Sequence, residues 1–178
     1  MKKKVIATLL SLTLLFATSS PVSASEITAA GAGTTPVDLT VETQILRVTI
    51  PLSLPITMTE DGEVMVADNA SITNHGAGPI KITDIEIKGA NGWSTVDYNS
   101  LDNASATVGG KNVGFSLNLA ATNILTTGAN TDNFSSGAIV ITKGQSLPLT
   151  YDAVLPAQKD EMVGVQVAEV IFTIGWND

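Results

Sequence analysis

LPLTYDAVL, residues 147–155, carries the longest unbroken alternation in this chain of 178 residues. Its apolar side chains stand at every second position, at Leu147, Leu149, Tyr151, Ala153 and Leu155. Successive side chains of a β-strand point to opposite faces of the sheet, so this spacing places all five on one face. The stretch therefore predicts a strand with one face in a hydrophobic core.

The same period of two recurs on both sides of this stretch, most clearly at residues 113–119. Clusters of Gly, Asn and Pro separate the alternating segments, which is typical of short antiparallel strands joined by turns. About nine strand segments are expected, at residues 37–50, 56–67 (a hairpin with its turn at 60–63), 71–74, 80–87, 93–98, 113–119, 137–142, 147–155 and 163–176.

Two of these segments change phase within their length. Across Thr83 and Asp84 the spacing of isoleucines grows from two residues to three, before it returns to two. One extra residue restores the buried face, so a β-bulge is expected near Asp84. A similar change at Ala168 and Glu169 predicts a second bulge in the C-terminal strand.

The rest of the chain offers no competing fold class. Residues 120–136 lack a clear period, and Ile124 and Leu125 are assigned to a short helical turn. No segment after residue 24 has the length and period of a helix of ten or more residues. We therefore expect an all-β fold, a single antiparallel β-sandwich of Ig-like or jelly-roll-like type.

The N-terminus has the layout of a cleaved secretory signal peptide, residues 1–24. Lys2, Lys3 and Lys4 precede a short apolar run, and Val22-Ser23-Ala24 supplies small residues for cleavage. The mature chain is expected to begin near Ser25, with a flexible arm at 25–35 and the sandwich domain at 36–178. This organisation predicts a secreted, extracellular protein.

The net charge and the lack of cysteine limit which partners and which anchors the chain can have. Beyond residue 24 there are six Lys and Arg against 17 Asp and Glu, a net charge of −11. Nucleic acid requires clustered basic residues, so it is not expected as a partner. Cysteine is absent, which excludes disulfides, and no second hydrophobic span follows Ala24. Any retention at a cell surface is therefore expected to be non-covalent and without a transmembrane segment in the mature chain.

The catalytic patterns that we tested are missing from the sequence. Nucleophilic catalysis requires a Ser or Cys beside a His, but His75 is the only histidine and stands in a Gly-Pro turn. Zinc sites require several His or Cys ligands. We expect no catalytic residues, no cofactor and no enzymatic activity, while a small hydrolase built on scattered acids remains the less favoured alternative.

Ligand binding is a stronger alternative. An exposed Trp or Tyr can present a flat face to a sugar ring, and Asx-rich loops can supply oxygen ligands to calcium. Trp93, Tyr98, Asn99 and Asp102 form the candidate ligand surface on these grounds. Asn and Asp also favour turns for local reasons, so a structural calcium ion stays one interpretation of these loops.

Two stretches resemble known secreted domains. Residues 72–82, ITNHGAGPIKI, are similar to a phrase of Ig-like sandwiches in bacterial surface proteins, and residues 163–174, VGVQVAEVIFTI, resemble the last strand of secreted fibre and pilin-like domains. The chain as a whole resembles the TasA and camelysin proteins in its signal peptide, lack of cysteine and Asn-containing turn. That resemblance implies an extracellular matrix fibre, although the longer insertions of those proteins are missing.

The leading hypothesis is therefore a non-enzymatic secreted or cell-surface protein that acts as a matrix, fibre or adhesive subunit. It would self-associate by strand addition, through the arm at 25–35 and the Val-rich C-terminal strand, or would bind another surface protein. The alternative from another class is a glycan- or calcium-binding module.

Overall fold

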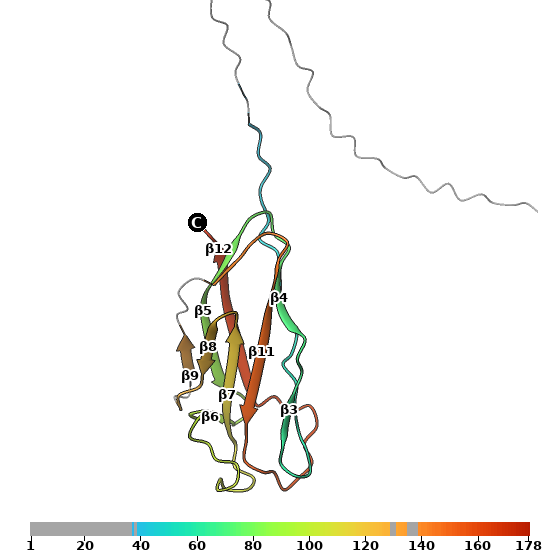
Figure 1. Cartoon of the computed structure of the whole chain (residues 1–178), viewed down its shortest axis with the longest axis vertical. Helices are drawn as coiled ribbons and strands as arrows, with labels where there is room; N and C mark the ends of the chain where they lie inside the picture. The colour runs from blue at the N-terminus through green and yellow to red at the C-terminus, as the bar shows by residue number, and fades with distance from the viewer. Residues whose placement is uncertain (1–36, 38, 129–130, 135–138) are drawn as a thin grey trace, which may run out of the picture. The chain divides into compact units, whose positions relative to one another are not determined.

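The computed structural model describes residues 37, 39–128, 131–134 and 139–178, with only the backbone at 131–134. The predicted signal peptide and arm lie outside the described residues. The chain divides into two units, residues 1–41 and 42–178, and the fold is that of the second. This unit is all-β, as predicted (Figure 1). Its strands are β1 (Val48–Thr49), β2 (Ile56–Met58), β3 (Val64–Val66), β4 (Ala70–Asn74), β5 (Ile80–Gly89), β6 (Ser94–Thr95), β7 (Asn112–Leu119), β8 (Thr122–Leu125), β9 (Thr131–Phe134), β10 (Ile139–Ile141), β11 (Ser146–Val154) and β12 (Ala168–Trp176).

The strands form two larger sheets and one hairpin. The first sheet has the order β1-β4-β11-β7-β6, and β8 also pairs with β7. In the second sheet β5 pairs with β12 on one edge and with β9 and β10 on the other. β2 and β3 form a separate antiparallel hairpin around the turn at 60–63, as the sequence predicted. The predicted strand at 147–155 corresponds to β11, which lies between β4 and β7.

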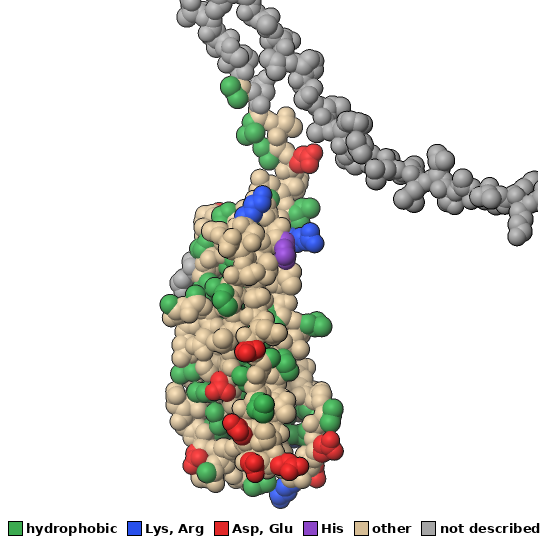
Figure 2. Space-filling view, turned by 45° about the vertical axis from the view of Figure 1, so that its right-hand side comes forward, with side chains coloured by type: hydrophobic (Ala, Val, Ile, Leu, Met, Phe, Trp, Pro, Cys, Tyr) green, Lys and Arg blue, Asp and Glu red, His purple; other side chains and the backbone are tan. Residues whose placement is uncertain are grey.

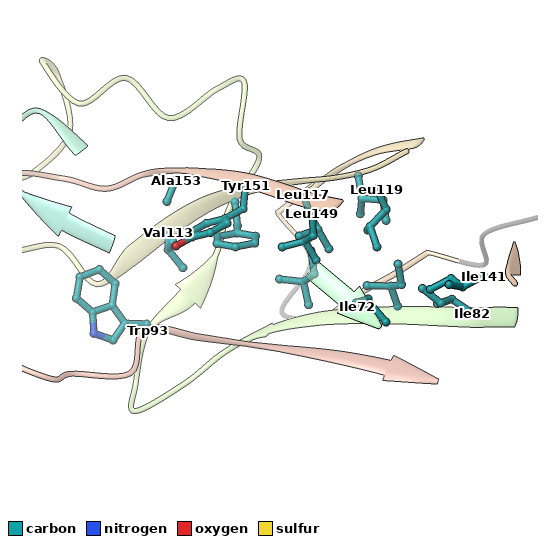
Figure 3. Close-up of a cluster of buried hydrophobic side chains, with 14 of the residues drawn as sticks. Ile72, Ile82, Trp93, Val113, Leu117, Leu119, Ile141, Leu149, Tyr151 and Ala153 are labelled. Atoms are coloured by element: carbon teal, nitrogen blue, oxygen red, sulfur yellow. The ribbon is translucent and has the colours of Figure 1, made fainter. Parts of the chain in front are cut away.

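Both larger sheets contribute to one hydrophobic core (Figure 3). The alternating residues of β7 and β11 are buried as predicted, and the four isoleucines of β5 are fully buried opposite them. Phe115 of β7 stacks on Tyr151 of β11, with ring centroids 5.9 Å apart. The buried hydrophobic residues are Ile72, Ile80, Ile82, Ile85, Ile87, Trp93, Val113, Phe115, Leu117, Leu119, Ile124, Ile141, Leu149, Tyr151, Ala153 and Leu155.

The predicted bulge in β5 is confirmed. Thr173 of β12 pairs with Asp84 and the next residue pairs with Ile82, so Thr83 is the extra residue. The Thr83 hydroxyl donates to the carbonyl oxygen of Thr173 at 3.2 Å. Because of this insertion, Ile82 and Ile85 both point into the core although they are three residues apart.

The second predicted bulge is wrong. The register from Ala168 to Thr173 is regular, and β12 begins at Ala168 instead of at Val163. Val163 is 83% exposed and precedes the strand as irregular chain. The phase change in the sequence therefore marks the start of the strand, where pairing with β5 begins.

The first predicted strand, residues 37–50, is also wrong for most of its length. Only Val48 and Thr49 pair, with Asn74 and Thr73 of β4. Residues 39–47 are irregular and exposed, and Val37 and Leu39 are 94% and 85% exposed. The alternation is real, but no described strand covers its apolar side.

Three smaller predictions also need correction. The residues assigned to a helical turn, Ile124 and Leu125, belong to strand β8, which pairs with β7. The predicted strand 93–98 shortens to β6, which runs parallel to β7. No strand was expected within 120–136, but residues 131–134 form β9 against β5. In each case a neighbouring strand supplies hydrogen bonds that local sequence does not reveal.

Asn74, the last residue of β4, holds together the backbone at one end of the fold. Its side chain is fully buried, and its amide nitrogen donates to the carbonyl oxygens of Gly78 and Ile141, both at 2.9 Å. Its amide oxygen accepts from the backbone N–H of Gly76 at 2.8 Å. One side chain thus ties the turn 75–79 to β10.

Within the described part of the chain, no helix is long and apolar enough to cross a membrane.

Candidate functional site

An apolar groove of about 850 Å³ follows the first half of β12. We call it the β12 groove. One wall is the stretch 164–172, the other is the stretch 50–58, and buried side chains close its base. Its lining residues are Ile50, Pro51, Leu52, Ser53, Leu54, Pro55, Ile56, Thr57, Met58, Val64, Trp93, Phe115, Leu155, Gln158, Met162, Gly164, Val165, Gln166, Val167, Ala168, Glu169, Val170, Ile171 and Phe172.

The first wall is the edge of a sheet. Among the described strands β12 pairs with β5 alone, so its other edge carries no strand. In an antiparallel pair every second residue directs its N–H and C=O away from the partner. Such outward groups are a template for another extended chain. The β12 groove therefore combines backbone donors and acceptors with an apolar surface.

The second wall cannot pair with β12 along its whole length, because Pro51 and Pro55 have no N–H to donate. Tyr151 holds this wall in place from the core. Its hydroxyl donates to the carbonyl oxygen of Pro55 at 2.6 Å and accepts from the N–H of Ala67 at 3.2 Å. The wall is thus kept beside the groove without closing it.

The base of the groove consists of Trp93, Phe115 and Leu155, each at most 6% exposed. Trp93 reaches this position because Gly89 lets the chain pass close by. A Cβ on Gly89 would lie 2.1 Å from the carbonyl oxygen of Trp93. The turn between them has Asn91 and Gly92 at φ of 51° and 81°, as an Asn-Gly turn requires.

The structure does not bring the four residues of the predicted ligand surface into one pocket. Trp93 is 5% exposed and lines the β12 groove, whereas Asp102 is exposed and lines a second, separate hollow. Tyr98 is half-buried and Asn99 is exposed, and neither lines these two hollows. The Asx side chains bond locally: Asp102 Oδ1 accepts from the N–H of Ala104 at 3.0 Å.

The second hollow, of about 500 Å³, is lined by three acidic residues. Glu60 and Asp61 of the β2–β3 turn line it together with Asp102. Asn103 joins the two loops by donating to the carbonyl oxygen of Gly62 at 2.9 Å. Over the described residues no group of three or more His, Cys, Asp or Glu side chains is placed to hold a metal ion.

Tyr98 has an altered acidity. Its burial and the hydrogen bond that its hydroxyl donates to Asp152 Oδ2, at 2.8 Å, raise its pKa to about 12. An unfolded tyrosine has a pKa of about 10. The folded chain therefore retains this proton at pH values where the unfolded chain has lost it.

A pH prediction follows from this difference. Because the unfolded state binds fewer protons between pH about 10 and about 12, the free energy of unfolding should fall as the pH rises through this interval. Tyr98→Phe should remove that part of the fall. Urea unfolding of both chains across this range measures it, and ultraviolet titration should show one tyrosinate forming near pH 12. A wild-type pH profile that matches that of Tyr98→Phe would contradict the assignment.

Comparison with known proteins finds no match: neither a family model, nor a curated protein, nor a solved structure is significantly similar to the chain.

The β12 groove is not predictable from the sequence. Two signals pointed toward it, the prolines at 51 and 55 and the unpaired apolar alternation from Val37 onward. Both describe segments that resist ordinary pairing within the fold. Neither reveals that the 50–58 stretch stands opposite β12, because that is a property of tertiary structure.

Proposed function

We propose that this protein is a secreted or cell-surface, non-enzymatic β-sandwich that acts as a subunit of an extracellular matrix or fibre. Copies would self-associate when the segment 37–45 of one copy enters the β12 groove of the next. The resemblance to TasA and camelysin proteins favours the same class. The observation that carries the proposal is an apolar groove beside a free strand edge, in a chain with an uncovered apolar segment.

The segment 37–45 has the pattern of a missing strand. Val37, Leu39, Val41 and Ile45 are all in phase, and their exposed fractions are 94%, 85%, 61% and 71%. Burying an aliphatic side chain of this size stabilises a complex by about 1.5 to 3 kcal/mol before ordering costs.

The occupant is expected to come from a second copy. Residues 41–48, VETQILRV, contain no Gly, Pro, Asn or Asp that would reverse the chain. Beyond them the chain continues through β1 into Ile50–Leu54, which is itself a wall of the groove. Without such a turn, residues 42–45 do not fold back onto the wall that they precede, so the proposed groove is that of a neighbouring copy.

The inserting segment proposed here differs from the one that the sequence predicted. The sequence-based hypothesis placed it at 25–35, which lies outside the described residues. Within the described residues, exposed apolar side chains stand at Val37, Leu39, Val41 and Ile45. The sequence-based hypothesis also let the Val-rich C-terminal strand add to an edge of a neighbouring copy, whereas in this proposal that strand is the edge that accepts the added segment.

Serine substitution of the segment tests the proposal. Mature chain, residues 25–178, should form large assemblies in sedimentation velocity and electron microscopy, whereas Val37→Ser, Leu39→Ser and Val41→Ser together should leave it monomeric with an unchanged melting temperature. Thr40→Ser, Glu42→Gln and Thr43→Ser together provide a matched control in the same segment, which should assemble as wild type does.

A peptide of residues 36–46 supplies the second arm of the test. It should bind the triple-serine variant and should block assembly of the wild-type chain, because it fills the groove. Val165→Asp, on the groove wall, should abolish both effects. A wild-type chain that stays monomeric across concentration, pH and salt, or a triple-serine variant that assembles normally, would overturn the proposal.

A further inference from the structure

We infer that Asn91, in the turn between β5 and β6, is a site of spontaneous deamidation, and that its conversion to isoaspartate loosens the β12 groove with time. Asn91 and Gly92 are the central residues of this turn, which the N–H of Trp93 closes by donating to the carbonyl oxygen of Ala90 at 2.9 Å. The inference goes beyond the proposed function, because it concerns a reaction of the folded chain and applies whatever occupies the groove.

Deamidation is an attack of the backbone on an asparagine side chain. The backbone nitrogen of the following residue loses its proton to hydroxide and bonds to the side-chain Cγ, and the bond from Cγ to the amide nitrogen breaks. That nitrogen takes a proton from water and leaves as ammonia. Water then opens the resulting five-membered imide at either carbonyl carbon, which gives aspartate or isoaspartate. The reaction is therefore fastest where the following N–H is free and its residue has no side chain to obstruct the attack.

Gly92 meets both requirements. It has no Cβ, and it is exposed together with Asn91. Among the hydrogen bonds of the described residues, none uses the N–H of Gly92. A Cβ built on Gly92 would lie 3.9 Å from Lys111 Nζ, so a cation stands beside the nitrogen as it becomes an anion and favours that form.

Two asparagines of the following loop do not meet these requirements. Asn99 and Asn103 are followed by Ser100 and Ala104, which both have a Cβ. The N–H groups of Ser100 and Ala104 also donate to oxygen atoms of nearby aspartates, at 3.1 and 3.0 Å. These two asparagines are therefore internal controls for Asn91 in the same part of the chain.

The turn is tied to a wall of the β12 groove. The Asn91 amide nitrogen donates to the carbonyl oxygen of Gln166 at 3.0 Å, and the N–H of Ala90 donates to that of Val167 at 3.1 Å. Gln166 and Val167 line the groove directly before β12. Because the bond from Asn91 to Gln166 is exposed, it slows the attack by about tenfold at most.

Conversion of Asn91 breaks this tie. A carboxylate cannot donate to the Gln166 carbonyl oxygen, and isoaspartate also adds one carbon to the main chain, so the two-residue turn no longer fits the bond that closes it. Trp93 follows the turn and forms part of the base of the groove, so it is released from its buried position. The groove thus loses support in one wall and in its base.

The turn lies at an end of the folded unit that is already acidic. β5 runs toward the lower end of Figure 1 and leads into this turn, and Figure 2 shows acidic side chains gathered at the lower end of its face. The product adds one more carboxylate there, and like charges repel. Because the converted chain is more negative than the original, anion exchange separates the two.

Peptide mapping of aged protein tests the site. Mature chain, residues 25–178, is kept at pH about 7 and about 8 for about ten half-lives of a free peptide of residues 89–94, which allows for the bond to Gln166. Trypsin cleavage after Lys88 and Lys111 then gives the peptide 89–111, which contains Asn91, Asn99 and Asn103 together. Fragmentation in the mass spectrometer locates aspartate and isoaspartate, with a sample digested at the start as the blank.

Asn91 should convert about tenfold faster than Asn99 or Asn103, because the hydrogen bonds at the three sites cost about the same and the missing Cβ of Gly92 decides. Its rate should rise about tenfold per pH unit, since the reacting anion is proportional to hydroxide. An Asn91 that stays intact, or that converts no faster than Asn99 and Asn103, would overturn the assignment of this site.

Tryptophan emission tests the effect on the groove. Converted chain isolated by anion exchange should emit at longer wavelength than unconverted chain, while Trp176, beside Gly78 at the other end of β12, supplies a constant background. Asn91→Gly is the matched control, because Gly-Gly keeps the turn type and cannot deamidate at this position. It should keep its emission over the same time. Converted chain with unchanged emission would overturn the loosening of the groove.

Discussion

Asn74→Ala is expected to lower the free energy of unfolding by about 4 kcal/mol, because it leaves three polar groups at this site without a partner. Each such group costs about 1 to 3 kcal/mol, and the cost is smaller where water reaches the group. Those groups are the N–H of Gly76 and the carbonyl oxygens of Gly78 and Ile141. Asn74 is fully buried, so the backbone must move before solvent can replace the lost amide. Urea unfolding, with the midpoint and slope fitted together, measures the change.

Thr73→Ala is the matched control one residue away. Among the described residues, the Thr73 hydroxyl bonds only to the Ser146 hydroxyl, at 2.7 Å and in an exposed position, so its loss should cost less than about 1 kcal/mol. Equal effects of the two substitutions would contradict the role of Asn74 as the link between the turn 75–79 and β10. Asn74→Asp should also be strongly destabilising, since a carboxylate cannot donate to the two carbonyl oxygens.

Gly89→Ala should destabilise the fold by about 3 kcal/mol, at the upper end of the usual cost of overpacking. The added Cβ would meet the Trp93 carbonyl oxygen at 2.1 Å and its carbon at 2.8 Å, and both are backbone atoms that no rotamer change can move. The N–H of Trp93 is also held by Ala90 at 2.9 Å. Relief therefore requires a shift of the chain that carries Trp93 out of the base of the groove.

Two measurements follow the Gly89 substitution: the urea midpoint, and the tryptophan emission, which should move to longer wavelength as Trp93 becomes exposed. Gly175→Ala is the control, because Gly175 lies in β12 with nothing within 4 Å of an added Cβ and a φ outside the left-handed region. It should change the free energy of unfolding by no more than about 0.5 kcal/mol. A Gly89 variant that is as stable as the Gly175 variant would show that the turn can yield without strain.

The residue pattern of short stretches was sufficient to predict much of the fold. The isoleucine spacing located the bulge at Thr83, because a strand with one buried face must keep its phase. The alternation of β7 and β11 likewise identified core residues, including Tyr151. These features depend on which way neighbouring side chains point, and that information is contained in a few consecutive residues.

Features that depend on a partner strand could not be predicted in this way. Val37 to Val41 alternate as clearly as β7, yet they have no described partner, whereas the polar β8 has one. Alternation shows that one side of a segment needs cover, and it does not say what covers it. Prediction of the candidate ligand surface failed for the same reason. The sequence shows that Trp93 is aromatic, but its burial depends on how closely its backbone approaches Gly89.

The pairing of β5 with β12 also affects how fast the chain folds and when it is open to aggregation. Thr83 and Thr173, joined across this pair, are 90 residues apart in the chain. Contacts of such long range make folding slow, typically milliseconds to seconds for small all-β domains. One backbone edge of β5 stays without its β12 partner until residues 168–176 have been synthesised, so the risk of premature aggregation is greatest during biosynthesis. We therefore expect a chaperone that shields residues 80–89 to raise the yield of soluble protein more than one that acts on the completed chain.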